Sequence, residues 1–359
     1  MRAEETVFDV AIIGGGIAGI SAAAAIAPHA SVLVLEQEDT LAYHASARSA
    51  ALYEPNYGNA AVKALSHASG DALRAANVLS PRGLMMLGRA EDDAFDDSIA
   101  DMNAVEISLD EAEKIFPILN RETVTRAAYA EHAWDIDTDL LIQTYLKSAR
   151  AQGAQIETRA RVTEITRGEV WTLQANGKTY KSRAIINAAG PWADTVAALA
   201  GVKPIGIQPY RRSMARLPMD GHDTRGWPMV FSVGETWYCK PDAGALIVSP
   251  AEEDPMDPHD AWADDMVLAE GLARYEEMVT EPVTRMIANW AGLRSFAPDR
   301  ALVIGQDTGV KGFFWLAGQG GYGFQSAPAS ADLIRDLVLG RVPALSASIV
   351  TSLSPARFS

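Results

Sequence analysis

Three closely spaced glycines near the start of the chain have the spacing of a phosphate-binding turn. Gly14, Gly16 and Gly19 follow an apolar run at residues 10–13 and precede an alanine-rich stretch. In this pattern the first glycine permits a tight turn out of a strand. The second lets the backbone approach a pyrophosphate, and the third lets a helix pack closely on the strand. The helix N-terminus adds free N–H groups and a partial positive charge. The spacing therefore predicts a dinucleotide-binding turn.

A second apolar run and an acidic residue extend this pattern. Residues 32–35 are apolar, and Glu36 follows them, 17 residues beyond Gly19. A carboxylate at this place accepts hydrogen bonds from the ribose hydroxyls and disfavours a 2′-phosphate, which predicts FAD or NAD rather than NADP. A secretory signal or membrane span does not agree with the segment. It starts with Asp9, lacks a strong basic flank and contains three consecutive glycines.

Size and charge exclude several other classes of protein. The chain has 359 residues and a net charge of −15. The length favours two domains. The negative charge repels nucleic acid and anionic membranes, so we expect neither as a partner. Outside the N-terminal unit there is no apolar run long enough to predict integral membrane association. Arginines stand out against this acidic background, as the pair Arg211-Arg212 and as Arg294 within apolar sequence.

Cysteine and metal chemistry are not indicated. The one cysteine, Cys239, forms no disulfide within the chain, which suits a cytoplasmic location. We interpret it as a small strand residue rather than a nucleophile. The six histidines lack metal-ligand spacing, and the acidic run 252–260 is interpreted as a solvated loop. We therefore expect no metal site.

Strand and helix patterns predict the elements that position these groups. The turn residues Asn176-Gly177 between two alternating runs are a strong hairpin signal. The predicted elements are helices at 59–77, 138–152 and 331–339, a hairpin at 170–183, strands at 184–187, 301–305 and 313–317, alternating strands over 206–300, and a glycine-dense turn at 318–323.

Together these segments resemble the FAD-dependent D-amino acid oxidase and dehydrogenase superfamily, nearest to the bacterial D-arginine dehydrogenase type. The most specific similarities lie at residues 43–51, 209–213, 238–244, 290–296 and 319–323, and the resemblance covers about residues 7–340. It implies an α/β fold with a discontinuous, Rossmann-like FAD-binding domain and a substrate domain built on an antiparallel sheet. The implied boundaries are 1–80, 138–205 and 300–359 for the FAD-binding domain, and 81–137 and 206–299 for the substrate domain.

The resemblance also implies which residues bind FAD. They are Gly14, Gly16, Ile17, Ala18, Gly19, Glu36, Gln37, Ser46, Arg48, Ser49, Ala50, Val162, Ala189, Gly190, Trp192, Gly318, Gly320, Gly321, Tyr322, Gly323, Phe324 and Gln325. The turn from Gly318 is expected to approach the isoalloxazine ring. There, backbone N–H groups at a helix N-terminus would stabilise the charge that develops on hydride transfer. Since Cys239 falls in the substrate sheet and nothing matches the family's linkage positions, we expect noncovalent FAD.

In the substrate site, Arg294 resembles the family's carboxylate-binding arginine. A guanidinium binds a carboxylate through two parallel charged hydrogen bonds. Tyr238 and Arg212 match further contacts on the carboxylate side, although a surface position for Arg212 is nearly as well supported. Tyr57 matches a tyrosine over the substrate, in a loop that could be a lid with Gly58 as its hinge. The four catalytic candidates are therefore Arg294, Tyr238, Arg212 and Tyr57.

The side-chain pocket departs from the arginine-preferring relatives. Leu84 stands where they carry a glutamate that pairs with a cationic substrate, and Leu52 replaces a polar ring. Gly320 is the third pocket candidate. The missing charge predicts a neutral, apolar side chain in the substrate. Glu54 in the lid-like loop could supply a charge, but we expect it to be exposed to solvent.

The resemblance implies oxidative deamination of a D-amino acid by hydride transfer to flavin N5. The imino acid would hydrolyse to a 2-oxo acid and ammonia, without an obligatory general base. A 2-hydroxy acid or an N-methyl amino acid such as sarcosine remains an alternative substrate, because either could use the same carboxylate clamp. An inactive FAD-binding module is a third possibility. Either oxygen or a quinone could serve as the electron acceptor.

Overall fold

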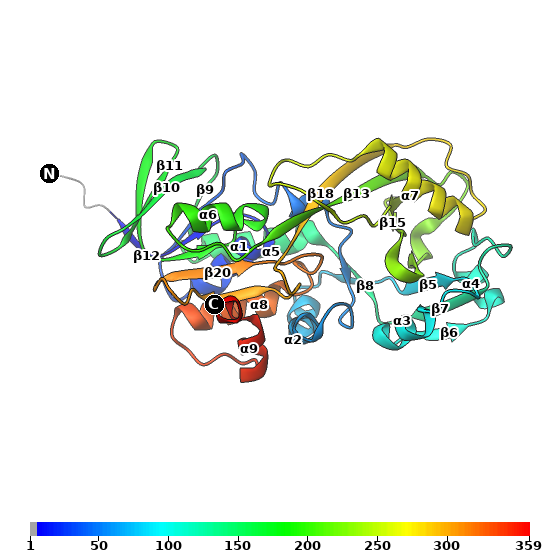
Figure 1. The fold of residues 1–359 in the computed structure, drawn as a ribbon, viewed down its shortest axis with the longest axis horizontal. Helices are drawn as coiled ribbons and strands as arrows, with labels where there is room; N and C mark the ends of the chain where they lie inside the picture. The colour runs from blue at the N-terminus through cyan, green and yellow to red at the C-terminus, as the bar shows by residue number, and fades with distance from the viewer. Residues whose placement is uncertain (1–5) are drawn as a thin grey trace.

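Two large β-sheets lie toward opposite ends of an elongated molecule (Figure 1). The structure is a computed structural model and describes residues 6–359. One sheet combines strands from the first half of the chain with two strands near its end, and the other is built mainly from the middle of the sequence. A small three-stranded sheet and helix α2 (Ala60–Ala75) lie between them.

The eight-stranded sheet has a parallel centre. Its strands are β1 (Val7–Ile13), β2 (Val32–Leu35), β9 (Gln155–Glu157), β10 (Val162–Arg167), β11 (Trp171–Ala175), β12 (Lys178–Asn187), β19 (Val303–Gln306) and β20 (Phe313–Ala317). β1 runs parallel to β12 and β2, and β20 runs parallel to β12. A parallel sheet must be covered on both faces. Accordingly, Val10 and Ile12 enter one hydrophobic core, and the intervening Ala11 and Ile13 enter another.

Helices cover the faces of this sheet. The helices are α1 (Ile17–Ile26), α5 (Thr138–Ala151), α6 (Ala193–Leu199), α8 (Ala327–Val338) and α9 (Ala347–Leu353). α1 packs against α5 and α8, whereas α6 packs against β10 and β12. Most of the α1 side chains that reach the first core are alanines, and their small size allows a close approach to the strands.

The turn from β1 into α1 requires its glycines. Gly14 has a φ of 110°, and a Cβ there would meet the carbonyl oxygen of Ala188. A Cβ on Gly19 would meet the carbonyl oxygen of Gly14. Glu36 directly follows β2. The predicted strand–turn–helix–strand–acid unit is confirmed.

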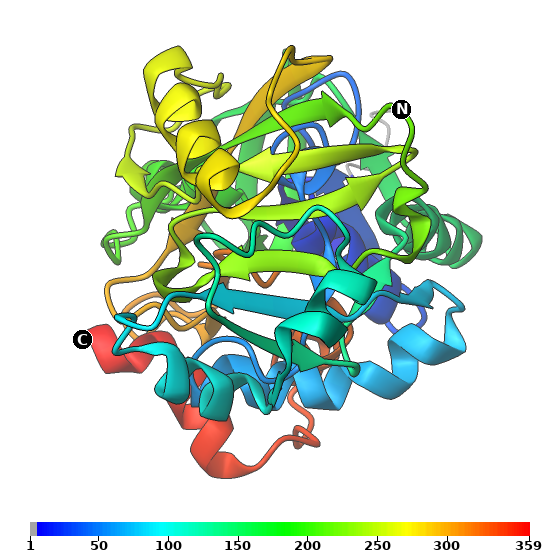
Figure 2. The same cartoon turned by 90° about the vertical axis from the view of Figure 1, so that its right-hand side faces the viewer.

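The nine-stranded sheet is mostly antiparallel and is seen from its outer end in Figure 2. Its strands are β5 (Leu84–Gly88), β6 (Val105–Ile107), β7 (Arg126–Ala130), β13 (Gln208–Pro218), β14 (Met229–Ser232), β15 (Tyr238–Asp242), β16 (Ala245–Ser249), β17 (Asp254–Pro255) and β18 (Ala288–Phe296). β14 and β5 are an exception, because they run parallel. Helices α3 (Phe95–Met102), α4 (Leu109–Ile115) and α7 (Asp265–Met278) flank the sheet. The long strands β13 and β18 extend from this sheet toward the first one (Figure 1).

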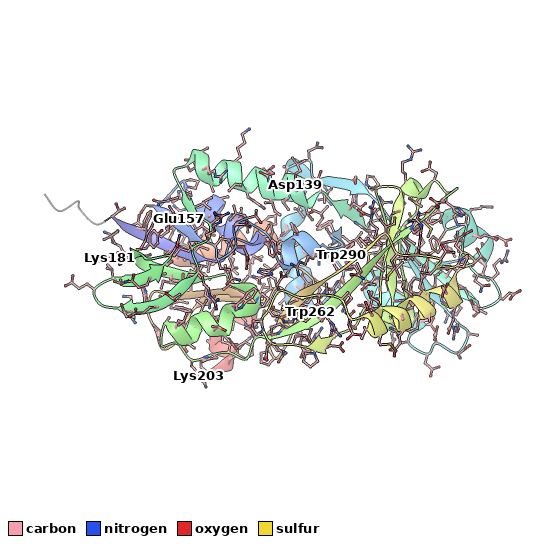
Figure 3. All side chains as sticks on the ribbon, turned by 90° about the horizontal axis from the view of Figure 1, so that it is seen from above. Asp139, Glu157, Lys181, Lys203, Trp262 and Trp290 are labelled. Carbon is pink, nitrogen blue, oxygen red and sulfur yellow. The ribbon has the colours of Figure 1, made fainter. Side chains whose placement is uncertain are left out.

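Short elements connect the two large sheets. The small sheet has the order β3 (Leu52–Tyr53), β8 (Trp134–Ile136) and β4 (Leu79–Pro81), and the 3-10 helices are η1 (Ala45–Arg48), η2 (Gly190–Trp192), η3 (Thr224–Gly226), η4 (Val233–Glu235) and η5 (Pro355–Phe358). Trp290 of β18 lies near the middle of the long axis, where its ring nitrogen donates to the carbonyl oxygen of Arg48 in η1 (Figure 3). This contact joins the second sheet to the loop that follows the first strand–helix–strand unit.

Most predicted elements are present, with three differences, one of which is that helix α7 lies within the region 206–300, where only strands were predicted. The helices predicted at 59–77 and 138–152 are α2 and α5, and the Asn176-Gly177 turn has positive φ at both residues, as a tight hairpin turn requires. The hairpin strand and the strand predicted at 184–187 form one continuous strand, β12. The helix predicted from 331 begins earlier, at Ala327. The proposed domain boundaries remain a prediction. Within residues 6–359, no helix has the length and apolar character needed to cross a membrane.

Candidate active site

Three adjoining cavities run from the first sheet toward the second. The outer, middle and inner cavities have volumes of about 880, 770 and 750 Å³. The outer and middle cavities share Gly16 and Ser46, and the middle and inner cavities share Arg212 and Arg294. The outer cavity lies at the carboxyl ends of β1 and β2, which is where open parallel sheets bind ligands.

The outer cavity contains the predicted ribose-binding acid. Glu36 is 7% exposed, and its carboxylate accepts hydrogen bonds from the backbone N–H groups of Gly15 (2.6 Å) and Glu38 (2.8 Å). These bonds fix the carboxylate, and its remaining lone pairs are available to a ribose hydroxyl. The predicted FAD residues that line this cavity are Gly14, Gly16, Glu36, Gln37, Ser46, Val162, Ala189, Gly190 and Trp192.

The middle cavity collects most of the residues predicted to surround the flavin. They are Gly16, Ile17, Ala18, Ser46, Arg48, Ser49, Ala50, Gly190, Gly320, Gly321, Gly323 and Phe324. The Ser46 hydroxyl accepts a hydrogen bond from the N–H of Ile17 at the start of α1, at 3.1 Å. Gly320 has a φ of 51°, and a Cβ there would collide with the Phe296 ring. Only glycine allows the backbone to take this path.

The outer and middle cavities suit FAD. Their length and continuity place the N-terminus of α1 between a ribose-binding carboxylate and a backbone-lined chamber. A Cβ on Gly16 would lie 3.3 Å from the Ser46 hydroxyl, in the space where α1 begins. The residues present would therefore hold the adenosine ribose on Glu36, the pyrophosphate at α1 and the ring system beside Gly320 and Gly321.

Some predicted cofactor residues lie elsewhere. Gly318 and Gly19 do not line the three cavities; Gly19 acts through the close packing of α1. Tyr322 lines a wider polar opening, here called the mouth cavity, and Gln325 lines the inner cavity. The glycine-dense turn also does not form a helix N-terminus, because α8 starts only at Ala327. The expected helix-dipole effect at this turn is therefore weaker than predicted.

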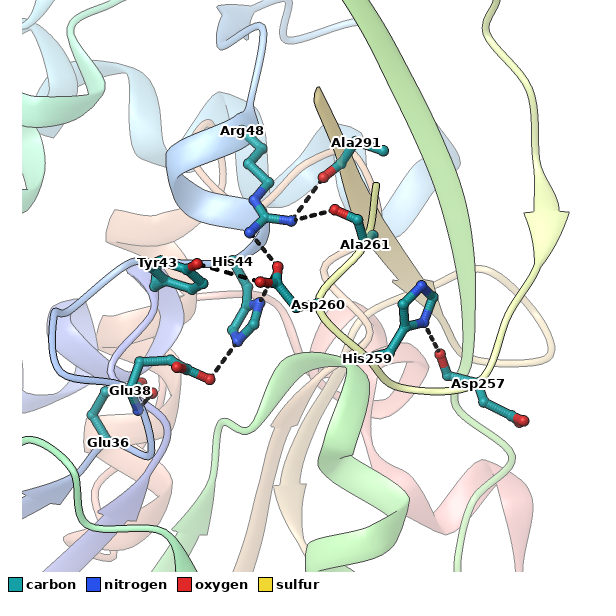
Figure 4. A network of polar contacts seen from close by, with 10 residues as sticks. All are labelled: Glu36, Glu38, Tyr43, His44, Arg48, Asp257, His259, Asp260, Ala261 and Ala291. Carbon is teal, nitrogen blue, oxygen red and sulfur yellow. Dashed lines mark hydrogen bonds and ion pairs between the residues drawn. The ribbon is translucent and has the colours of Figure 1, made fainter. Parts of the chain in front are cut away.

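A polar network connects the loop after β2 to the segment after β17 (Figure 4). Arg48 pairs with Asp260 and donates to the carbonyl oxygens of Ala261 and Ala291, both at 2.9 Å. The His44 ring lies 2.9 Å from the Glu38 carboxylate and 3.7 Å from that of Asp260. Because Arg48 and His44 line the middle and outer cavities, the network fixes one wall of the cofactor site.

The acidic run 252–260 is not a simple solvated loop. The Glu252 side chain is only 7% exposed, Asp254 pairs with Arg211 at 2.6 Å, and Asp260 pairs with Arg48. The sequence interpretation was wrong here because the loop passes two arginines whose charges need partners. No group of three or more metal-ligating side chains is placed to hold an ion in the described part of the chain.

Arg294 is the most informative residue of the inner cavity. It stands on β18 opposite Tyr210 and lines both the middle and inner cavities. Its guanidinium donates to the Tyr238 hydroxyl at 3.4 Å, and among residues 6–359 it forms no ion pair with a carboxylate. A Cβ on Gly321 would lie 3.3 Å from Arg294 Nη1, so the backbone wall of the middle cavity touches the cation. A charge left without a protein partner in a cavity favours an anionic ligand.

Arg212 supports the same site. It is 5% exposed and lines the middle and inner cavities, so the alternative of a surface position is wrong. Its guanidinium donates to the Glu252 carbonyl oxygen at 3.0 Å and pairs with Glu253 at 3.3 Å. Burial, and then the nearby charge of Arg294, lowers the pKa of Arg212. The two arginines thus repel each other until an anion lies between them.

Tyr57 and Glu235 separate the inner cavity from the mouth cavity. Both residues line both cavities, and the Tyr57 hydroxyl donates to the Glu235 carboxylate at 2.7 Å. Burial raises the pKa of Tyr57, and the Glu235 charge adds to this increase. Glu235 was missed in the sequence. Its only local signal is Gly234 in a turn before Tyr238, and the contact with Tyr57 spans 178 residues.

The rest of the inner cavity is largely apolar. Leu52 and Leu84 line it as predicted, whereas Gly320 lies in the middle cavity. Met102, Met229 and Phe231 complete the apolar wall and were not predicted. Glu54 also lines this cavity and is 3% exposed, so the expectation that it faces solvent is wrong. The reason is its position directly after β3, beside β8 and bonded to Gln325, which precedes α8.

Comparisons with known proteins agree with this geometry. The chain matches the family of FAD dependent oxidoreductases named DAO over residues 9–337. The chain belongs to this family. It is a FAD-dependent oxidoreductase, and its α/β fold combines a Rossmann-like FAD-binding domain with a substrate domain.

Individual relatives are distant. The chain is 24% identical over 245 residues to the uncharacterized oxidoreductase YurR of Bacillus subtilis, covering 66% of this chain and 63% of YurR. It is 25% identical over 265 residues to human mitochondrial dimethylglycine dehydrogenase, covering 67% of this chain and 30% of that protein. Thus the chain matches less than two thirds of the length of either relative. The crystal structure of glycine oxidase from Geobacillus kaustophilus superposes with a TM-score of 0.84 and 21% identity, covering 98% of both chains.

Proposed function

We propose that this oxidoreductase oxidises an α-amino acid of D configuration, with a neutral and mainly apolar side chain, to the imino acid. The observation that carries the proposal is Arg294, a cation without a carboxylate partner on the wall between the middle and inner cavities. Bound FAD would supply the hydride acceptor. The imino acid would then hydrolyse to a 2-oxo acid and ammonia.

Six residues of the inner cavity have roles in this proposal. Arg294 binds the substrate carboxylate, with the Tyr238 hydroxyl beside it, and so fixes the α-carbon near the middle cavity. Arg212 adds a second cation on the carboxylate side. Tyr57 closes the cavity toward the mouth and excludes water. Leu52 and Leu84 receive the side chain. D configuration rests on the resemblance alone.

The test is anaerobic mixing of the yellow holoprotein with a panel of substrates. The panel contains D- and L-amino acids, sarcosine, dimethylglycine and 2-hydroxy acids, and bleaching of the flavin absorbance is followed. We expect D-amino acids with apolar side chains to bleach the flavin fastest. Faster bleaching by N-methyl amino acids or 2-hydroxy acids would replace the proposed substrate class. No bleaching by any member would leave a binding module.

The same preparation tests the mode of cofactor binding. We propose that FAD is noncovalent, because Cys239 is fully buried in the second sheet, away from the cavities. Acid precipitation should release intact FAD into the supernatant. Colour that stays with the precipitated polypeptide would show a covalent flavin.

A further inference from the structure

A buried carboxylate and a partly exposed imidazole meet at the wall of the inner cavity. Glu54 follows β3 and His132 precedes β8. These strands pair antiparallel with Tyr53 opposite Trp134, so the register brings Glu54 beside His132 across 78 residues of sequence. The N–H of Glu54 donates to the Gln325 side chain at 3.0 Å, and this bond fixes the turn. The pair is therefore built by three separate segments of the fold.

The hydrogen bonds of Glu54 leave it free to exchange a proton. Its Oε1 accepts from the Asn56 N–H at 2.9 Å and lies 3.0 Å from His132 Nε2. Oε2 is also 3.0 Å from that nitrogen but has no hydrogen bond of its own. Burial raises the pKa of the Glu54 carboxyl, while the backbone bond from Asn56 and the His132 charge oppose the rise. A carboxyl group with a raised pKa in a cavity is a better proton acceptor than a carboxyl group in water.

His132 connects this carboxyl group to solvent. The Glu54 side chain is 4% exposed, whereas the His132 side chain is 33% exposed. The Asn56 side-chain amide lies 3.0 Å from His132 Nε2. A neutral ring can accept from that amide at Nε2, and a protonated ring can donate from Nε2 to Glu54. Both protonation states of the ring thus have a partner, as a proton relay requires.

The proposed reaction needs an acceptor for the amine proton, and an acceptor on the cavity wall would replace the expectation from the sequence that no general base is obligatory. An α-ammonium group has no lone pair with which to form the C=N bond, so it must lose a proton first. The Arg212 and Arg294 cations in the inner cavity cannot accept one. The Tyr57 hydroxyl already donates its hydrogen to Glu235, and burial raises the pKa of Tyr57. Glu235 is already bonded to Tyr57. Glu54 is the remaining carboxylate on the cavity wall among the described residues.

We propose that Glu54 accepts the proton of the substrate ammonium group, directly or through one water, and passes it to His132. The N–H bond of the ammonium breaks and an O–H bond forms on Glu54, which leaves a neutral amine. The O–H bond then breaks as the proton moves to His132 Nε2, and the imidazolium releases it to solvent. No electrons are exchanged in these steps. The relay rests on the proposed function, because it serves an amine substrate bound at Arg294.

The decisive experiment is the pH dependence of flavin reduction in Glu54→Gln. The amide keeps the size of the carboxylate and can still accept from the Asn56 N–H, but it cannot take a proton. At pH values below the pKa of the substrate amine, we expect single-turnover reduction to slow by about 10²- to 10⁴-fold. Above that pKa the substrate arrives as the neutral amine, so the rate should return toward that of the parent. A structural role would lower the rate at every pH.

Two further variants sharpen the test. His132→Asn keeps a polar partner for Glu54 but removes the imidazole. We expect the rate of flavin reduction to fall less than in Glu54→Gln and to recover in the same way at high pH. If Glu54→Gln fails to retain FAD, the pH dependence of His132→Asn tests the relay in its place. In Glu235→Gln, the matched carboxylate change on the same cavity, any loss should not recover at high pH.

The outcomes separate the relay from the proposed function. Normal bleaching of the parent by amino acids, with an unchanged pH profile in Glu54→Gln and His132→Asn, overturns the relay alone. A pH-independent loss in Glu54→Gln also overturns it. A parent protein that no amino acid reduces at any pH refutes the proposed function and the relay with it.

Discussion

Arg211 and Arg294 lie on the paired strands β13 and β18, but Arg211 is paired with carboxylates and Arg294 is not. Arg211 faces the loop that follows β16, where it pairs with Asp254 at 2.6 Å and lies within 4 Å of Glu252 and Asp264. Arg294 faces the cavities and has only the Tyr238 hydroxyl as a hydrogen-bond partner within the described chain. Both are enclosed by the fold, and one register step decides which face each side chain takes.

The difference distinguishes structural arginines from ligand-binding ones. A cation that the fold needs only for stability is surrounded by acids, as Arg211 is. A cation whose partner is missing costs stability unless a ligand supplies the anion. The same contrast applies to acids: Glu252 accepts a hydrogen bond from the N–H of Ser213 at 2.7 Å, whereas Glu54 on the cavity wall lies 3.0 Å from the His132 imidazole. Unpaired charge, more than conformity to a motif, marks the site.

Replacing each arginine separately by methionine tests this comparison, and Arg294→Met has the largest expected effect on activity. Arg294→Met should lower kcat/KM by about 30-fold to several thousand-fold, because losing one partner of a buried charge pair costs about 2–5 kcal/mol. FAD should stay bound. Steady-state kinetics and flavin absorbance measure the two effects.

Arg211→Met is the matched control for Arg294→Met. It leaves three acids near a neutral side chain, so we expect a lower free energy of unfolding by about 3–5 kcal/mol. In the protein that remains folded, substrate should still reduce the flavin. Unchanged kcat/KM in Arg294→Met would show that Arg294 is structural and would remove the contrast between the two faces.

The two ends of the site also differ in how far the sequence predicts them. At the cofactor end, Gly14, Gly16, Gly19 and Glu36 lie within one local unit, and steric demands fix the residue types at the turn. Their positions were predicted correctly because no distant contact is needed to place them.

At the substrate end, the decisive contacts are long-range. Arg294 was found because an arginine within apolar sequence is conspicuous, and the resemblance supplied its role. Glu54 and Glu235 could not be placed, because the register of β3 on β8 and the turn at η4 decide their surroundings. The burial of Arg212 likewise depends on the loop that folds over it. The sequence identifies such residues as charged, but it does not show which distant residues contact them.

A smaller effect is expected in the choice of substrate side chain. Leu52, Leu84, Met229 and Phe231 make that part of the inner cavity apolar, so a cationic side chain would lose water there. The two carboxylates of the cavity are already engaged, Glu54 with His132 and Glu235 with Tyr57. An apolar side chain gains about 25 cal/mol for each Å² that it buries. We expect kcat/KM for D-leucine or D-methionine to exceed that for D-arginine or D-lysine by about 10- to 100-fold.

The opposite preference would change the meaning of Glu54. If D-arginine is the better substrate, the argument from the apolar wall is wrong, and the Glu54 carboxylate is the first counter-charge to test. Measuring both substrates in Glu54→Gln separates the two roles. A relay slows every amine substrate at low pH, whereas a counter-charge affects only the cationic ones.

The smallest effect is expected on the face where charges are already paired. The Asp260 side chain is 55% exposed, and an exposed ion pair contributes about 0–1 kcal/mol. In Asp260→Asn, Arg48 keeps its bonds to the carbonyl oxygens of Ala261 and Ala291. The Kd for FAD should therefore rise by no more than about fivefold, and salt should reduce the difference because it screens exposed charges. Fluorescence titration of the apoprotein with FAD, at low and high ionic strength, measures both effects.

Since Asp260 does not line the inner cavity, kcat at saturating FAD should stay near that of the parent. A large loss of kcat would mean that the loop over Arg48 also shapes the substrate site, and that paired and unpaired charges in this protein do not divide structure from function.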